Sequence, residues 1–145
     1  MKIAKAETEI GFLLTQASLL KQRINNNALK SLNLTYMQFV VMAAIYEFSE
    51  EYDEPLQQLI ITKRQLDKSM VSGILKTLIE RKLVQRYENP NDTRSKVVKL
   101  TIAGENLVVN AKEIIKTIDE KFFKAIDQEF LKSTLIKLYS FDTKI

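Results

Sequence analysis

The chain has 145 residues, a length typical of a single domain, and 46% of its residues are apolar while 28% are charged. It contains no Cys and no His, which excludes disulfides, zinc-finger sites, thiol nucleophiles and imidazole acid–base catalysis. Only three Gly and two Pro interrupt it, so we expect long helices rather than a sandwich of many short strands.

The sequence shows no targeting or membrane segment. No uninterrupted apolar run approaches the roughly 20 residues needed to cross a bilayer. The first residues, MKIAKAETEI, turn acidic before an apolar stretch develops and do not resemble a signal peptide. We therefore expect a soluble cytoplasmic protein that binds no membrane and carries no cofactor.

The net charge of +4 is unevenly distributed along the chain. Residues 62–100 hold 10 Lys/Arg and 4 Asp/Glu, whereas residues 1–61 hold 5 and 7, and residues 101–145 hold 7 of each. The whole positive excess thus lies in the middle segment. Concentrated basic charge is expected of a nucleic-acid contact surface. Judged on charge alone, a solvated Lys-rich face explains it equally well.

Two helices are predicted in the first third of the chain. Apolar residues recur every three or four positions over residues 4–31, which predicts one long amphipathic helix. Next, Thr35 occupies an N-cap position with Gln38 as its capping-box partner, so a second helix is expected to follow and to run through Phe48. Residues 49–55 form an acidic linker that ends in proline.

The middle segment predicts two further helices. A short one spans about Leu56 to Lys63, and a second, capped by Asp67, spans about Lys68 to Lys82. The apolar positions of the second helix leave basic and small polar residues on its opposite face. A helix needs such a face to reach phosphates and base edges in the major groove. These residues are Lys68, Ser69, Ser72, Gly73, Lys76 and Thr77.

The pattern then changes from helical to extended. Residues 83–87 and 96–100 are two short β-type runs around residues 88–95, which contain the turn-forming pairs Asn-Pro and Asn-Asp. This predicts a two-stranded hairpin packed on the helices. Thr101 is expected to cap a long helix through Ile126, and Asp127 to cap a last one.

A helix, a short helix, a turn, a basic helix and a charged hairpin follow one another in the order of a winged helix-turn-helix. No single part is specific, but together they centre on the one basic segment of the chain. The second helix of the pair is then the one that enters the major groove, and the hairpin reaches the flanking backbone or the minor groove.

Three segments resemble the multiple-antibiotic-resistance-regulator (MarR) family. Residues 66–72 resemble the start of its recognition helix, and residues 78–84 are similar to the end of that helix and the entry to the wing. Residues 91–96, followed by Val98, Leu100 and Gly104, resemble its Asp-x-Arg wing. Two positions depart from the family: Gln65 stands where Gly is common, and Gly73 stands where a larger, often basic residue is frequent.

The resemblance implies a mainly α fold, a winged helix-turn-helix with a two-stranded β wing and long N- and C-terminal dimerisation helices. Residues 1–145 would form one domain, in which about 35–100 bind double-stranded DNA and 1–34 and 101–145 pair two subunits. A homodimer places two recognition helices about 34 Å apart and implies a pseudo-palindromic operator. Repression of transcription is the expected activity, and activation is the alternative.

The candidate DNA-binding residues fall into two groups. Arg94 is the central wing candidate, and Asp92, two residues earlier, is expected to hold its guanidinium by a charge-assisted hydrogen bond. By contrast, the aromatic residues of the second helix are expected in the core. The major-groove candidates are Lys68, Ser69, Ser72, Lys76 and Thr77, and the wing candidates are Arg86, Arg94 and Lys96 with Asp92.

Two other functions are compatible with parts of this pattern. The same fold could be a protein–protein interaction module whose basic face binds an acidic partner; a steep salt dependence of duplex binding separates the two. An enzyme is disfavoured because acids such as Asp92 and Glu88 have no nucleophile or base nearby in sequence. Without Cys or His, neither thiol-based sensing nor a typical transition-metal site is expected, which leaves a small organic effector or none.

Overall fold

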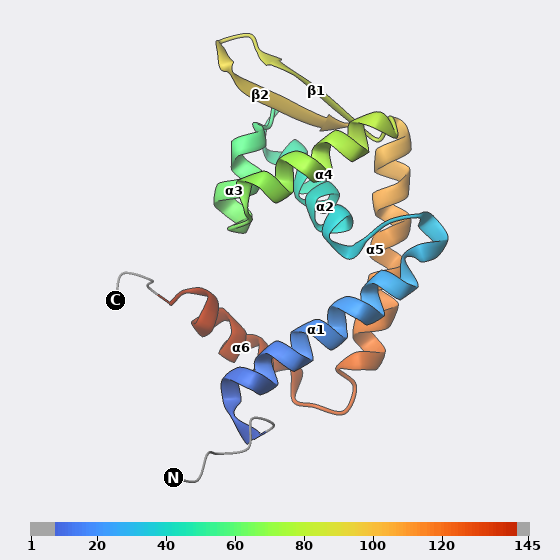
Figure 1. Cartoon of the computed structure of the whole chain (residues 1–145), viewed down its shortest axis with the longest axis vertical. Coiled ribbons are helices and arrows are strands. Elements are labelled where there is room, and N and C mark those ends of the chain that lie inside the picture. The colour runs from blue at the N-terminus through green and yellow to red at the C-terminus, as the bar shows by residue number, and fades with distance from the viewer. Residues whose placement is uncertain (1–7, 142–145) are drawn as a thin grey trace.

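The structure is a computed structural model, and it describes residues 8–141. A compact lobe, formed by α2, α3, α4 and the hairpin β1–β2, lies at one end (Figure 1). A helical arm, formed by α1, the C-terminal half of α5 and α6, extends from it, and α5 runs through both parts (Figure 1). The elements are α1 (Ile10–Ala28), η2 (Lys30–Leu32), α2 (Tyr36–Glu51), α3 (Gln57–Arg64), α4 (Lys68–Glu80), β1 (Val84–Asn89), β2 (Asp92–Leu100), α5 (Ile102–Phe122) and α6 (Gln128–Tyr139).

The predicted helix starts are confirmed by their hydrogen bonds. Thr35 and Gln38 form the full capping box: Thr35 Oγ1 accepts from the N–H of Gln38 at 3.1 Å, and Gln38 Oε1 accepts from the N–H of Thr35 at 3.0 Å. Asp67, Thr101 and Asp127 each accept from the backbone N–H three residues ahead, at 2.9–3.1 Å. Each cap satisfies a donor that the first helical turn leaves without a helical partner.

Helix ends are less well predicted than helix starts. The fourth helix ends at Glu80 rather than Lys82, because Lys82 adopts a left-handed φ of 59° that stops the helix. The helix predicted over residues 4–31 ends at Ala28 and is followed by a 3₁₀ turn and by Asn33 at φ 53°. It begins at Ile10, while predicted residues 4–7 lie outside the described residues.

The other helix ends differ by a few residues. α2 continues to Glu51, into the predicted acidic linker, and α3 spans Gln57–Arg64 rather than 56–63. α5 ends at Phe122 rather than Ile126. Turn-forming composition therefore places these helix ends only to within about four residues.

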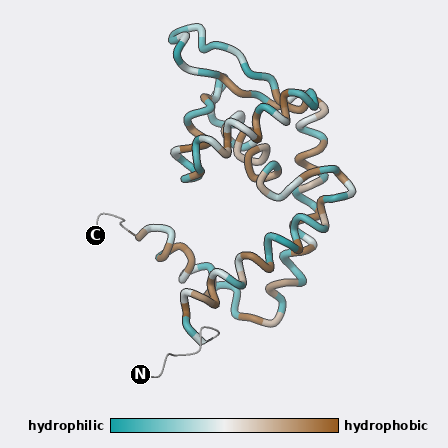
Figure 2. The backbone as a smooth tube through the Cα atoms, in the orientation of Figure 1, coloured by the Kyte–Doolittle hydropathy of each residue, from teal (hydrophilic) through white to brown (hydrophobic). Residues whose placement is uncertain are grey.

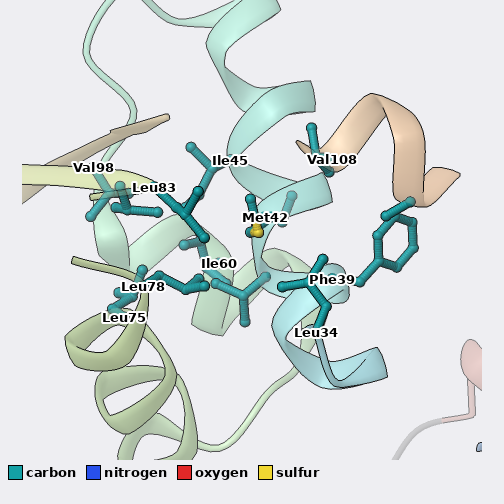
Figure 3. Packing of buried hydrophobic residues seen from close by; sticks show 14 of the residues in the cluster. Leu34, Phe39, Met42, Ile45, Ile60, Leu75, Leu78, Leu83, Val98 and Val108 are labelled. Atoms are coloured by element: carbon teal, nitrogen blue, oxygen red, sulfur yellow. The ribbon is translucent and has the colours of Figure 1, made fainter. Parts of the chain in front are cut away.

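One hydrophobic core fills the compact lobe around α2 and extends to the facing side of α5. Met42 and Ile45 of α2 are fully buried, and the side chains of the neighbouring helices and the hairpin surround them (Figure 3). Phe39 and Phe48 are buried at 8% and 7% exposure, which confirms the core position predicted for them. Burying each such side chain contributes about 1.5–3 kcal/mol. The core therefore holds α4 firmly against α2.

The hairpin is longer and its turn tighter than predicted. β1 and β2 pair antiparallel from Val84 with Leu100 to Glu88 with Lys96, and a bulge precedes the pairing of Asn89 with Asp92. The predicted turn over residues 88–95 is therefore wrong: most of it lies in the strands. Cross-strand pairing extends the ladder over residues whose own preference is for turns.

The base of the hairpin is locked to the start of α5. Thr101 donates its N–H to the Leu83 carbonyl at 3.0 Å and its hydroxyl hydrogen to the Lys82 carbonyl at 2.8 Å. Gly104 approaches the residue before β1 so closely that a Cβ there would lie 2.1 Å from the Leu83 oxygen. Glycine is therefore required where α5 contacts the base of the hairpin.

The helical arm leaves much apolar surface exposed. Asn25 is the one residue of α1 that is buried, and α6 buries none of its residues. Figure 2 shows hydrophobic residues along both helices, outside the compact lobe. None of the described helices is long and apolar enough to cross a membrane. The exposed apolar residues of these helices include Ile10, Phe12, Leu13, Leu14, Leu19, Leu20, Phe130, Leu135, Ile136, Leu138 and Tyr139.

Candidate DNA interface

Helix α4 separates its residues into a buried and an exposed face, as its sequence predicts. Val71, Leu75 and Leu78 are fully buried in the core. The structure gathers the five predicted major-groove candidates on the other side: Lys68, Ser69, Lys76 and Thr77 are exposed, and Ser72 is half-buried. Asp67 fixes the start of the helix through the N–H of Met70.

Two features shape the middle of the exposed face. A Cβ built on Gly73 meets no atom within 4 Å, so the face has an open gap there. The hydroxyl of Thr77 donates to the Gly73 carbonyl at 3.3 Å, within the same helix. The exposed side of α4 is therefore unobstructed, and its small residues leave room for a surface to approach closely.

The turn before α4 needs a left-handed residue, and Gln65 supplies it with a φ of 52°. Glycine adopts this conformation at less cost, which is consistent with the Gly expected at this position from the resemblance to the MarR family. Arg64, the residue of α3 just before Gln65, makes its contacts within the compact lobe. Arg64 pairs with Glu47 and stacks 4.9 Å from the centre of the Phe48 ring. Arg64 thus joins α3 to α2 and adds little to the exposed charge.

The predicted contact between Asp92 and Arg94 is present at the tip of the hairpin. Asp92 Oδ1 accepts from both the backbone N–H and the Nε–H of Arg94 at 3.1 Å, and Asp92 Oδ2 lies 3.5 Å from Nη2. These hydrogen bonds hold the pKa of the Asp92 carboxyl below its usual value. The Arg94 side chain is 90% exposed and extends into solvent.

The remaining wing candidates lie lower on the hairpin. Lys96 is exposed and faces Glu88 across the two strands, with 3.5 Å between Nζ and Oε1. Arg86 is also exposed, and its Nη1 lies 3.5 Å from Gln57 Oε1 at the start of α3. Arg86 therefore sits where the hairpin meets α3, apart from the tip that carries Arg94.

Sequence reasoning missed the role of Arg81. This residue follows α4 and donates from Nη1 to the Asn33 carbonyl at 2.7 Å and from Nη2 to the Leu32 carbonyl at 3.5 Å. Its partners are 48 and 49 positions away in the chain. No local pattern signals such a contact; the segment stands out in the sequence only by the similarity of residues 78–84 to the family's motif.

Sequence reasoning also missed a lysine held inside the helical arm. Lys21 Nζ lies 2.6 Å from Asp119 Oδ1 and 2.7 Å from Asn25 Oδ1, and its side chain is 17% exposed. The rings of Phe122 and Phe123 lie 5.6 and 5.9 Å from the same nitrogen, within cation–π range. Lys21 and these two rings help to line a cavity of about 440 Å³ between α1, α2, α5 and α6.

Tyr36 lies on the α2 side of this cavity. Its burial, and secondarily the negative charge of Asp119, raise the pKa of its hydroxyl. Tyr36 therefore remains a neutral hydrogen-bonding group at physiological pH. The cavity combines an apolar, aromatic lining with a few polar groups, as small-molecule sites commonly do.

Comparisons with known proteins agree on one type of protein. Residues 30–119 match the profile of the ArnR1-like winged-helix domain. The chain is 32% identical to the HTH-type transcriptional regulator YdcH of Bacillus subtilis over 124 residues, which cover 86% of this chain and 84% of YdcH. Among solved structures, S. aureus MepR in complex with DNA is similar with a TM-score of 0.83 and 25% identity, covering 92% of this chain and 98% of MepR.

A MarR-family transcriptional regulator from Rhodococcus sp. RHA1 is similar with a TM-score of 0.79 and 26% identity, covering 96% of this chain and 95% of that one. Together with the exposed face of α4 and the hairpin beside it, these similarities define a winged-helix, DNA-binding transcription regulator. The chain belongs to the MarR family of these regulators. Its relatives are likewise transcription regulators.

Proposed function

We propose that the protein is a cytoplasmic repressor that binds a pseudo-palindromic operator as a homodimer, with no enzymatic activity. One observation carries the proposal: an unobstructed face of basic and small polar residues on α4 lies beside a hairpin that presents an ordered, solvent-exposed Arg94. In the proposed division, residues 35–100 bind DNA, while residues 1–34 and 101–145 pair the subunits. Blocking a promoter requires no more than such binding.

The major groove is assigned to the exposed side of α4. Lys68 and Lys76 would neutralise phosphates, while the hydroxyls of Ser69, Ser72 and Thr77 would reach phosphates or base edges. Of these three residues, Ser72 is half-buried, so its hydroxyl would read only a closely approaching edge.

The wing candidates would act at two levels. Arg94, positioned by Asp92, would enter the minor groove or contact the backbone beside the half-site, since arginine suits narrow grooves. Lys96 and Arg86 would contact the backbone closer to α3. The wing would thereby extend the contact beyond the bases that α4 reads.

The second subunit is assigned to the apolar surface of the helical arm. α1 and α6 expose long apolar residues such as Leu13, Leu20 and Leu135 at 43–49%. Monomeric proteins rarely expose contiguous apolar surface on this scale. A two-fold pairing of the same helices would bury it and set the two recognition helices on successive major grooves. Light scattering at micromolar concentration should give the mass of a dimer, and a monomer would contradict the two-site geometry.

The DNA-binding test compares two substitutions on α4. The operator is first recovered by selecting bound sequences from random duplex DNA. Lys76→Ala should then weaken binding to operator and random duplexes by similar factors and reduce the salt slope by about one unit, as expected for a phosphate contact. Ser72→Ala should change discrimination among sites instead. Lys112→Ala, which removes an exposed lysine of α5, is the control.

The same titration separates DNA binding from docking to an acidic protein. Retention of affinity and salt slope by Lys76→Ala would show that the proposed groove face is wrong. Failure to recover any preferred duplex would favour the interaction module.

The cavity in the helical arm supports a second proposal, a small organic anion as effector. Lys21 has three N–H donors, of which two reach Asp119 and Asn25, so the third can serve a carboxylate while the rings of Phe122 and Phe123 pack against an apolar body. Titration with benzoate as a probe should release DNA from the wild type but not from Lys21→Met. Equal release from both would remove Lys21 from the site.

A further inference from the structure

The end of α1 and the connection that follows it are held by hydrogen bonds to the start of α2 and to the residue that ends α4. Asn26, in the last turns of α1, accepts a hydrogen bond from the first N–H of α2, that of Tyr36, at 2.6 Å. Arg81, at the end of α4, donates to the carbonyls of Leu32 and Asn33 at 3.5 and 2.7 Å. One side chain thus ties the end of α4, the proposed recognition helix, directly to the segment that joins α1 of the arm to α2 of the lobe.

The carbonyls that Arg81 binds are available because of the shape of this connection. The 3₁₀ turn over Lys30–Leu32 and the left-handed Asn33 end the run of helical hydrogen bonds, so these carbonyls lack the partners that a continuing α-helix would give them. A guanidinium presents its N–H donors as a planar fork, and two of them reach adjacent carbonyls here. Lysine, with a single point charge, would not reproduce this geometry.

The core already fixes α4 within the compact lobe, since Leu75 and Leu78 are fully buried. The orientation of the whole lobe relative to the arm depends on fewer contacts. These are the continuous helix α5, the packing of α1 on α2, the connection that Arg81 holds, and a hydrogen bond of 3.4 Å from the Tyr139 hydroxyl of α6 to the Lys63 carbonyl of α3. Because the arm is the part proposed to pair two subunits, the lobe orientation determines the separation of the two recognition helices.

We infer that Arg81 is a positioning residue that sets which spacing between operator half-sites the dimer accepts. This inference rests on the proposed dimeric DNA binding. Arg81 acts through its two carbonyl partners and needs no contact with DNA. Loss of this contact should leave the reading of each half-site unchanged but allow the lobes to adopt a wider range of orientations.

A direct phosphate contact is the competing role for Arg81. A hollow of about 430 Å³ next to it is lined by Lys30 and Thr77 as well, and carries no acidic side chain. The structure favours positioning because Arg81 is partly buried as a residue and its guanidinium directs two donors at protein carbonyls. The two roles predict different salt dependence, since a phosphate contact contributes about one unit of salt slope.

The test uses duplexes that carry two copies of the selected half-site with the spacing varied one base pair at a time. Wild type should show one sharp optimum. Arg81→Ala should lose about tenfold in affinity at that optimum, less than about twofold at neighbouring spacings, and keep its salt slope; tenfold corresponds to about 1.4 kcal/mol. Arg81→Lys should be intermediate, and Arg23→Ala, which removes an exposed arginine of α1, should match wild type.

A second measurement needs no DNA. The chain has no natural cysteine, so Ser69→Cys carries one spin label per subunit. The distance distribution between the two labels of a dimer should broaden when Arg81→Ala is added. Thermal unfolding identifies a variant that merely fails to fold, in which case Arg81→Lys provides the comparison.

Three results would overturn the inference. If Arg81→Ala keeps a sharp spacing optimum and a narrow label distribution, the role inferred for Arg81 is contradicted, while the proposed dimeric DNA binding is not. A uniform loss at all spacings with a salt slope lower by one unit would identify a phosphate contact instead. A wild type with no optimum would contradict the proposed two-site binding itself. Flattening of the profile in Arg81→Ala, with an unchanged salt slope, is the result expected.

Discussion

The carboxylate at the tip of the wing sets up a test in which two physical effects have opposite signs. Neutralising Asp92 removes a negative charge from a surface proposed to contact phosphates, which by simple electrostatics should tighten DNA binding. The structure predicts the reverse. Asp92 holds the Nε–H and the backbone N–H of Arg94 at 3.1 Å, and the arginine side chain is otherwise 90% exposed. Without that carboxylate, the guanidinium would be ordered only on binding.

The relative size of the two effects decides the sign. Removing a single solvated charge about 10 Å from phosphates changes affinity by about twofold at most, because water and salt screen it. Ordering one long side chain on binding changes the dissociation constant by about 2- to 10-fold. Asp92→Asn should therefore weaken operator binding although it raises the net charge. Arg94→Ala should cost about 1–3 kcal/mol if the guanidinium reads a base edge.

Fluorescence titration of one labelled operator at fixed salt provides the assay, with Asp92→Asn, Arg94→Ala and the double variant compared with wild type. The two effects should fall short of additivity, because Asp92 acts through Arg94. Glu88→Gln is the matched control, since it neutralises a carboxylate of the same hairpin that faces Lys96 and not Arg94. Tighter binding by Asp92→Asn would refute the reasoning and leave Asp92 as a solvated turn residue.

Gly73→Ala should raise the free energy of unfolding by about 1 kcal/mol in urea denaturation, because alanine favours helix and a Cβ meets nothing within 4 Å there. Gly104→Ala should lower it by about 1–3 kcal/mol, because a Cβ would lie 2.1 Å from the Leu83 carbonyl oxygen. By NMR titration the Asp92 carboxyl should have a pKa below the usual value, and Arg94→Ala should raise it; since the shift is downward, the contact persists at neutral pH and is lost only as pH falls through the lowered pKa. Mild peroxide and zinc chelators should leave DNA binding unchanged, as measured on the same operator, because the chain has no Cys or His.

Much of the fold follows from local chemistry. Thr35, Asp67, Thr101 and Asp127 each satisfy a donor within three residues, so sequence alone locates four helix starts. The apolar period of the α4 segment likewise fixes which side is buried. The contact of Asp92 with Arg94 was predictable for the same reason, since two residues separate the partners.

Most of what the sequence does not reveal depends on partners outside the same helix or strand. The strands extend into residues 88–95 because residues such as Glu88 and Lys96 pair across the hairpin. The residue pattern of either strand alone does not show this pairing. The fork from Arg81 to Asn33 and the cluster of Lys21 with Asp119 join segments 48 and 98 positions apart. Left-handed Lys82 also ends α4 without the glycine that normally signals such a stop.

Helix α5 has 21 residues and passes from the compact lobe to the far end of the arm (Figure 1). At 1.5 Å per residue it is a rod of about 30 Å. A rod of that length converts a tilt of about 5° at the end in the arm into a displacement of about 2–3 Å at the other end. One step along DNA is about 3.4 Å. A change too small to disturb the packing around Phe122 could therefore move a recognition helix by most of one base pair.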